Sequence, residues 1–133
     1  MEKDYKKEIE RIRKVYKKIQ DTYCPVLFSK ITFNGQGFHH LRYHGGGRSR
    51  TVEDTLYKIK LFPYILPVII NSRKIVGYKK VLEPQNRTNI RPQKEVEYWA
   101  IVAEDKKLHN IKVILKRIGK GKLMFWSVMK TKK

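Results

Sequence analysis

The first 24 residues alternate apolar and charged positions with the period of a helix. Apolar or aromatic residues recur every three or four positions, and Lys, Arg and Glu fill the positions between them: Tyr5, Ile9, Ile12, Val15, Tyr16, Ile19 and Tyr23. This spacing places one apolar stripe along an otherwise charged helix. We therefore expect a helix over residues 3–22, within an N-terminal helical region of residues 1–24. Its tyrosines would belong to the core or, as the alternative, stack on bases.

Further elements are indicated before the middle of the chain. Val26–Phe33 favours a short extended segment. Thr51 and Asp54 have the spacing of a capping box, which predicts a helix that begins there and ends near Phe62, before a proline. The apolar segment Tyr64–Ile70 fits a strand or a helical turn equally well. The expected buried stripe of the helix consists of Val52, Leu56 and Ile59.

The second half of the chain has the character of strands. Two glycines in Gly119–Gly121 predict a hairpin between the last two strands, and Glu83–Lys94 is a polar loop of about a dozen residues. Helices first and strands later favour an α+β fold, with N-terminal helices packed on a C-terminal antiparallel sheet of about four strands within residues 74–130. The predicted strands are Lys74–Leu82, Glu95–Ala103, Ile111–Ile118 and Leu123–Met129.

Composition limits the class of protein. The 133 residues are 41% hydrophobic, enough for one domain with a real core over residues 1–133. The single cysteine, Cys24, excludes an intramolecular disulfide scaffold and fits a reducing compartment. The longest apolar run, Leu61–Ile70, has ten residues and two prolines, too short to span a bilayer. We expect a cytoplasmic protein without a secretory signal or membrane partner.

Positive charge is concentrated in parts of the chain. Lys and Arg number 31 against 12 Asp and Glu, a formal net charge of +19. The ten Lys and Arg residues from Lys106 onward have no acidic residue among them, and residues 22–52 also lack acids. Such segregation favours contact with phosphates, although a generally lysine-rich composition would raise the count in the same way. The expected RNA-binding residues of the hairpin are Lys116, Arg117, Lys120 and Lys122.

Residues 34–51 combine histidine, arginine and glycine, and we predict that they form a functional loop. Histidine can take a proton from a ribose 2′-hydroxyl and return one to the leaving oxygen near neutral pH. Arginine can hold the non-bridging phosphate oxygens, and glycines let backbone N–H groups approach them. The candidate catalytic residues here are His40, His44, Arg42 and Arg50, and the candidate substrate-binding residues are His39, Arg48 and Thr51.

Other interpretations of these residues stay open. A histidine of this segment could be a packed, hydrogen-bonded side chain, or a metal ligand. The segment contains no carboxylate or cysteine to complete a usual coordination set, so we expect neither a metal nor a cofactor. On the last strand, alternation places Leu123, Phe125, Ser127 and Met129 on one face. Ser127 interrupts an apolar strand, either as a structural serine or as a catalytic-site ligand of phosphate or ribose.

The chain resembles the barnase, EndoU, colicin and RelE-like superfamily of small metal-independent ribonucleases, in particular its phage-associated branches. Phe38–Leu41, followed by the Arg/Gly run, is similar to the histidine-leucine signature of one such branch, and Phe125–Ser127 is similar to the family's last strand. The layout match covers roughly residues 1–130. The resemblance implies N-terminal helices followed by a four-stranded antiparallel sheet, and cleavage of RNA without a metal.

Together these observations predict an endoribonuclease of toxin or phage type. It would cleave RNA by attack of the 2′-hydroxyl, leave a 2′,3′-cyclic phosphate, and have an acidic inhibitor or antitoxin protein as a further partner. The alternative is a non-catalytic nucleic-acid-binding protein of a phage or mobile element, in which the loop only holds phosphates. A DNA nuclease is disfavoured because the loop offers no carboxylates for hydrolytic metals.

Overall fold

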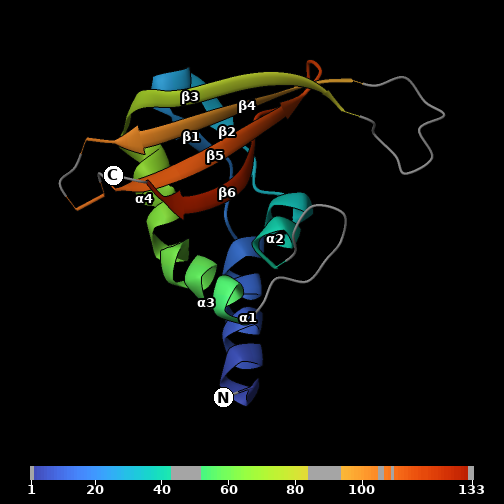
Figure 1. Cartoon of the computed structure of the whole chain (residues 1–133), viewed down its shortest axis with the longest axis vertical. Coiled ribbons are helices and arrows are strands. Elements are labelled where there is room, and N and C mark those ends of the chain that lie inside the picture. Colours follow the sequence, from blue (N-terminus) through green and yellow to red (C-terminus); the bar gives the residue numbers. More distant parts are fainter. Residues whose placement is uncertain (1, 43–51, 84–93, 105–106, 109, 132–133) are drawn as a thin grey trace.

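The computed structural model of the chain describes residues 2–42, 52–83, 94–104, 107–108 and 110–131. Four strands form one antiparallel sheet in the order β3-β4-β5-β6, and a separate two-stranded sheet pairs β1 with β2 (Figure 1). The elements in chain order are α1 (Glu2–Lys17), β1 (Thr22–Cys24), η1 (Pro25–Leu27), β2 (Ser29–Ile31), α2 (Gly35–Arg42), α3 (Val52–Leu61), η3 (Phe62–Tyr64), α4 (Ile65–Ile70), β3 (Ser72–Glu83), β4 (Lys94–Ala103), β5 (Ile111–Ile118) and β6 (Met124–Lys130).

The predicted α+β fold is confirmed. Every α-helix in the described part of the chain precedes β3, and the four strands lie within one or two residues of their predicted limits. The ambiguous segment Tyr64–Ile70 is helical, because a 3-10 turn continues directly into α4. No helix in the part that the structure describes is long and apolar enough to cross a membrane.

Two predictions near the N-terminus are wrong. The first helix ends at Lys17 rather than at residue 22, because Thr22–Cys24 pairs with Ser29–Ile31 in a small hairpin sheet. Residues 35–42 of the predicted loop form the helix α2, in spite of their glycines. Asn34 stabilises the start of this helix, because its side-chain Oδ1 accepts a hydrogen bond of 3.2 Å from the backbone N–H of Gly37.

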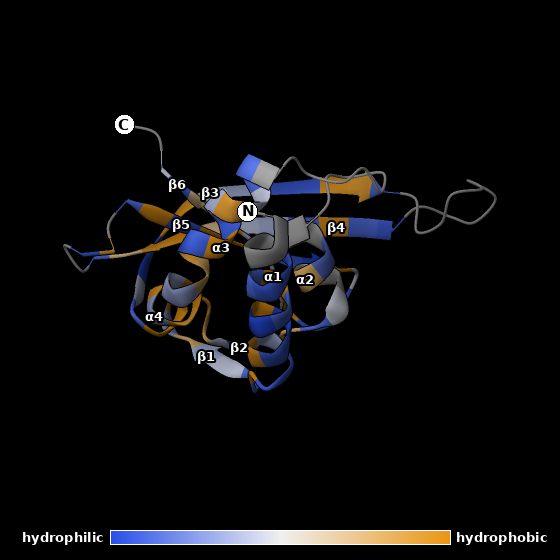
Figure 2. Cartoon of the chain, turned by 90° about the horizontal axis from the view of Figure 1, so that it is seen from below, coloured by the Kyte–Doolittle hydropathy of each residue, from blue (hydrophilic) through white to orange (hydrophobic). Residues whose placement is uncertain are grey.

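The core lies between the helices and one face of the sheet. Ile12 and Tyr16 of α1 and Ile65 and Ile69 of α4 pack there, and the outer surface of α1 is mostly hydrophilic (Figure 2). Cys24 of β1 is fully buried in the same core, with its Sγ 3.4 Å from Ser72 Oγ at the start of β3. The residues of the large sheet that face this core are Ile101, Ala103, Ile111, Val113, Leu115, Phe125 and Val128.

The helix α3 is rotated from its predicted orientation. Its buried side chains include Thr55 and Lys58, whereas Leu56 of the predicted stripe is 36% exposed. The helix lies beside the outer edge of β6, where the backbone N–H of Lys130 donates a hydrogen bond of 2.7 Å to the Tyr57 hydroxyl. This rotation brings a lysine side chain, rather than an apolar one, toward the sheet.

The helix α2 approaches β6 unusually closely at Gly37. A Cβ atom at this position would lie 2.5 Å from the Tyr16 hydroxyl and 2.6 Å from the carbonyl oxygen of Phe125. Around this contact the ring of Tyr16 meets the rings of Phe33, Phe38 and Phe125, with centroids 5.4–6.3 Å apart. The absence of a side chain at Gly37 therefore allows α1, α2 and β6 to meet at one point.

Gly37→Ala should lower the free energy of unfolding by about 1–3 kcal/mol, because the added methyl group overpacks this contact. Urea unfolding measures the effect. The matched control is Gly35→Ala in the same helix, where a Cβ atom would have no neighbour within 4 Å, and this variant should be neutral or slightly more stable. Equal destabilisation by the two substitutions would show that the close approach at Gly37 does not matter.

Candidate nucleic-acid interface

The face of the sheet turned away from the core, which we call the open face, carries two adjacent rows of side chains. The register pairs Lys79 with Tyr98, Tyr98 with Lys116, and Lys116 with Met124. The neighbouring row runs across the four strands through Gly77, Ala100, Ile114 and Ser127. Because directly paired residues share a face of a sheet, each row is continuous from β3 to β6.

A β-bulge in β6 adds Trp126 to the open face. Ile114 pairs with Ser127 and Leu115 pairs with Phe125, so Trp126 is an extra residue with no partner in the register. Ser127 and Met129 therefore line the open face together with Trp126, whereas Phe125 and Val128 face the core. The prediction that Leu123, Phe125, Ser127 and Met129 share one face is wrong beyond Phe125, because the bulge reverses the alternation.

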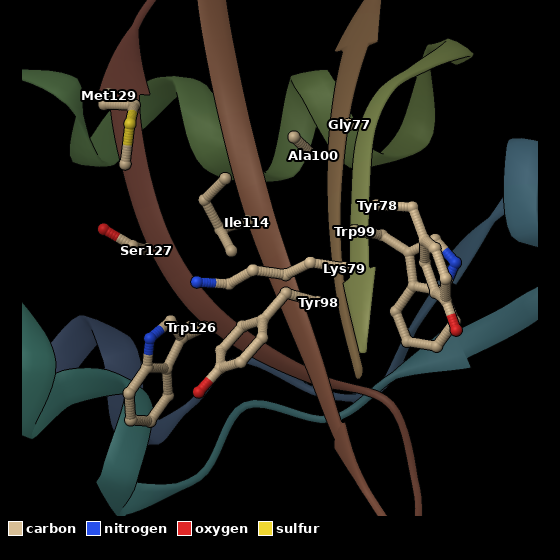
Figure 3. A pocket seen from close by; sticks show the side chains of 10 residues that line it. All are labelled: Gly77, Tyr78, Lys79, Tyr98, Trp99, Ala100, Ile114, Trp126, Ser127 and Met129. Atoms are coloured by element: carbon tan, nitrogen blue, oxygen red, sulfur yellow. The ribbon is translucent and has the colours of Figure 1, made fainter. Parts of the chain in front are cut away.

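The open face holds a cavity of about 420 Å³. Gly77 and Ala100 line the bottom of the cavity, where their small size leaves space, and Trp126 and Tyr98 lie beside it (Figure 3). The side chain of Lys79 extends across the sheet, and its ammonium lies 5.0 Å from the centroid of the Tyr98 ring. The cavity thus combines aromatic surface with a cation.

A buried lysine lies next to this cavity. The Nζ of Lys116 is 3.8 Å from the centroid of the Trp126 ring and 5.5 Å from that of Tyr98. Its charge is balanced by Glu83, whose Oε1 is 3.8 Å away and whose Oε2 accepts a 2.8 Å hydrogen bond from the Tyr98 hydroxyl. Burial lowers the pKa of the Lys116 amine, and the Glu83 carboxylate partly offsets this shift. The pKa of Tyr98 is raised mainly by burial and to a smaller extent by the hydrogen bond to Glu83.

Ser127 is buried and is held in place from α3. The ammonium of Lys58 donates hydrogen bonds to Ser127 Oγ at 3.0 Å and to the backbone oxygen of Val128 at 2.5 Å. Both partners lie just after the bulge in β6. Lys58 therefore ties α3 to the part of the strand where the face reverses, and it fixes the orientation of the serine that lines the cavity.

Arg117 lies on the opposite face of β5 from Lys116. Its Nη2 is 2.6 Å from Glu97 Oε1, and its guanidinium lies 5.3 Å from the centroid of the Trp99 ring. The Tyr78 hydroxyl donates a 2.6 Å hydrogen bond to the other oxygen of Glu97. Both hydrogen bonds lower the pKa of the Glu97 carboxyl, and the bond from Tyr78 has the larger effect. Lys116 and Arg117 consequently belong to two different surfaces.

Only some of the predicted site residues lie on the open face. Lys116 and Ser127 both lie on the open face, in its two neighbouring rows, while Lys120 and Lys122 are exposed around the turn between β5 and β6. His39 is exposed on α2. The backbone of His40 and Arg42 belongs to α2, but their side chains lie outside the described residues, as do the whole of His44, Arg48, Arg50 and Thr51.

The two helices that flank residues 43–51 both contact β6. Gly37 of α2 packs against Phe125, and Lys58 of α3 is bonded to Ser127 and Val128. The two helices on either side of the histidine and arginine segment are thus both held by the same edge strand.

Several residues of this site are not identified by sequence reasoning. Lys79 and Tyr98 lie within predicted strands, whereas Glu83 was assigned to the polar loop and is in fact the last residue of β3. Only the strand register brings the three together. Strand alternation places Lys79 and Glu83 on one face of β3, but the apolar Val81 lies between them, so the pattern within this strand alone does not indicate a polar row. Among the described residues, no group of three or more His, Cys, Asp or Glu side chains gathers as a metal site would require.

Lys58→Met should lower the free energy of unfolding by about 1–3 kcal/mol, because it leaves Ser127 Oγ and the Val128 carbonyl without their buried donor. Urea denaturation measures the loss. The matched control is Lys60→Met, an exposed position on the same helix, which should change stability by no more than about 0.5 kcal/mol. If Lys58→Met is as stable as its control, the amine does not anchor the strand.

In comparisons with known proteins, no family model matches the chain, and no curated protein or solved structure is significantly similar to it.

Proposed function

We propose that this protein binds single-stranded RNA on its open face and cleaves it without a metal ion. The observation that carries the proposal is the pairing of aromatic rings with lysine ammonium groups across the four strands. Tyr98 lies beside Lys79 and Lys116, and Trp126 lies beside Lys116. Unpaired bases stack on aromatic side chains, and ammonium groups attract the phosphates between them.

The charge of the whole chain supports a polyanionic ligand. A net charge of +19 steers nucleic acid toward the protein over distances of about a Debye length. Among the described residues, no ion pair engages Lys79. Its ammonium is thus available to an incoming phosphate, whereas Lys116 is already balanced by Glu83.

Two sets of groups can supply the proton transfers of cleavage. The first is His40 with His44, because imidazole gains and loses a proton near neutral pH, and Arg42, Arg48 and Arg50 would hold the phosphate. The second is Glu83, a carboxylate on the open face that already contacts Tyr98 and Lys116. In either case the 2′-hydroxyl is the nucleophile and the 5′-oxygen leaves, so the product ends in a 2′,3′-cyclic phosphate.

Lys79→Gln should weaken RNA binding and reduce its dependence on salt. The logarithm of the association constant for a single-stranded oligonucleotide falls with the logarithm of the salt concentration, by about 0.7 per phosphate contact. Titrations at several salt concentrations should show a slope that is lower by about this amount in Lys79→Gln. Lys7→Gln removes the same charge from exposed α1 and should keep the original slope. Equal slopes for the two variants would place the RNA elsewhere.

His40→Ala should reduce RNA cleavage by about 10²- to 10⁴-fold with little change in RNA affinity, because a general acid or base acts on the chemical step. Cleavage should persist in EDTA, and RNA with a 2′-O-methyl group at the cut site should resist. The assay compares His40→Ala, His44→Ala and Glu83→Gln. A loss confined to Glu83→Gln would assign the proton transfer to the open face.

The non-catalytic alternative makes a different prediction in the same assay. A protein that only binds RNA would show the salt-dependent affinity but no cleavage of any RNA. Full cleavage by all three variants would likewise overturn the proposed acid–base roles.

A further inference from the structure

The two edge strands of the large sheet, β6 and β3, differ in the contacts that other elements make with their outer edges. Along β6, the backbone N–H of Thr32 donates to the Leu123 oxygen and the N–H of Phe125 donates to the Thr32 oxygen, both at 2.9 Å. Farther along the same edge, the Tyr57 hydroxyl and the Lys58 ammonium bond to the backbone of β6. Residues from the N-terminal half of the chain thus cover β6.

At the other edge strand, β3, the described residues provide cover only at its start, where η1 lies beside it and the Val26 N–H donates a 3.3 Å hydrogen bond to Ser72 Oγ. The strand has twelve residues, and within the described part of the chain no backbone hydrogen bond from another element reaches its outer edge. Two register shifts interrupt its first half, but Gly77–Glu83 pairs regularly with β4. A regular, unpaired edge offers alternating N–H and C=O groups to another extended chain.

The side chains of this edge are unusually apolar for a surface strand. Val76, Tyr78 and Leu82 are 47%, 53% and 62% exposed. Natural edge strands avoid such exposure, because it invites pairing with another strand. The same strand has four cations, Arg73, Lys74, Lys79 and Lys80, and one acid, Glu83.

We infer that the free edge of β3 at Gly77–Glu83 is a docking site for an extended, acidic polypeptide segment that adds a fifth strand to the sheet. Apolar side chains of the segment would pack on Tyr78 and Leu82 on one face of β3, and its carboxylates would lie on the other face beside Lys79, since Lys80 is already paired with Glu95 at 3.2 Å. A second copy of this chain fits less well, because each copy carries a net charge of +19. RNA lacks the regular amide donors and acceptors that pair with a strand edge.

A short peptide tests this inference directly. The probe is acetyl-(Glu-Val)₄-amide, and its control is acetyl-(Glu-Pro)₄-amide, which has the same charge but lacks half of the backbone N–H groups. Amide hydrogen exchange of the full chain should slow within Gly77–Glu83 when the first peptide is added, and should not change within β6. The proline peptide should leave both strands unchanged.

A pair of protein variants locates the contact. Leu82→Glu should weaken binding of the valine peptide severalfold, because it replaces an apolar contact with a like charge. Val15→Glu makes the same kind of change at a position on α1 that is 43% exposed, and should bind as the wild type does. Circular dichroism of both variants verifies that they fold.

Several outcomes would overturn the inference. One is that the valine peptide fails to bind, or that it binds without slowing exchange in Gly77–Glu83. Another is that the proline peptide slows exchange as much as the valine peptide does. A third is that Val15→Glu weakens binding of the valine peptide as much as Leu82→Glu does. Slow exchange of this segment that depends on protein concentration alone would identify a second copy as the occupant. RNA that protects the segment in place of the peptide would assign it to the nucleic acid. None of these measurements depends on RNA cleavage.

Discussion

The close approach of α2 to β6 is the constraint on which the rest of the arrangement depends. With no side chain at Gly37, the Tyr16 hydroxyl and the Phe125 carbonyl both lie where a Cβ atom would stand. The helix can therefore lie directly on the strand, and the aromatic rings around it hold α1 in the same place. Because Phe125 and Tyr16 belong to the core, α2 is held against the core side of β6 together with α1. The packing of α1 and α2 on this side of β6 leaves Tyr98, Lys116 and Trp126 on the opposite face of the sheet.

Local sequence patterns account for most of the fold. The strands were predictable because their apolar, β-branched runs are bounded by turn residues, and Gly119–Gly121 is a clear hairpin signal. The helix α2 was not predictable in this way, because glycines normally indicate a loop. Its stability depends on the Asn34 cap and on tertiary contacts with β6. The bulge at Trp126 has no local signal at all. It arises from the register with β5, which a pattern within a single strand cannot contain.

The site was predictable to a smaller extent. Lys116 stands out through charge, and Ser127 through its interruption of an apolar strand. The remaining groups of the open face depend on strand register, since Glu83 and Lys116 are 33 positions apart in the chain and come together only in the sheet. Lys58 was hidden by the predicted stripe of α3, which places apolar residues inward. The rotation of that helix, with Lys58 bonded to two groups of β6, is a tertiary preference that overrides helical periodicity.

The burial of Cys24 also provides a built-in reporter. It is the only cysteine of the chain, it is fully buried, and it lies where the small hairpin sheet meets the start of β3. A thiol reagent can reach it only when this region opens, so the rate of modification measures the free energy of that opening without an added label. Occupation of the open face or of the β3 edge by a ligand that binds only the closed form would slow this rate, because binding shifts the population away from the open state.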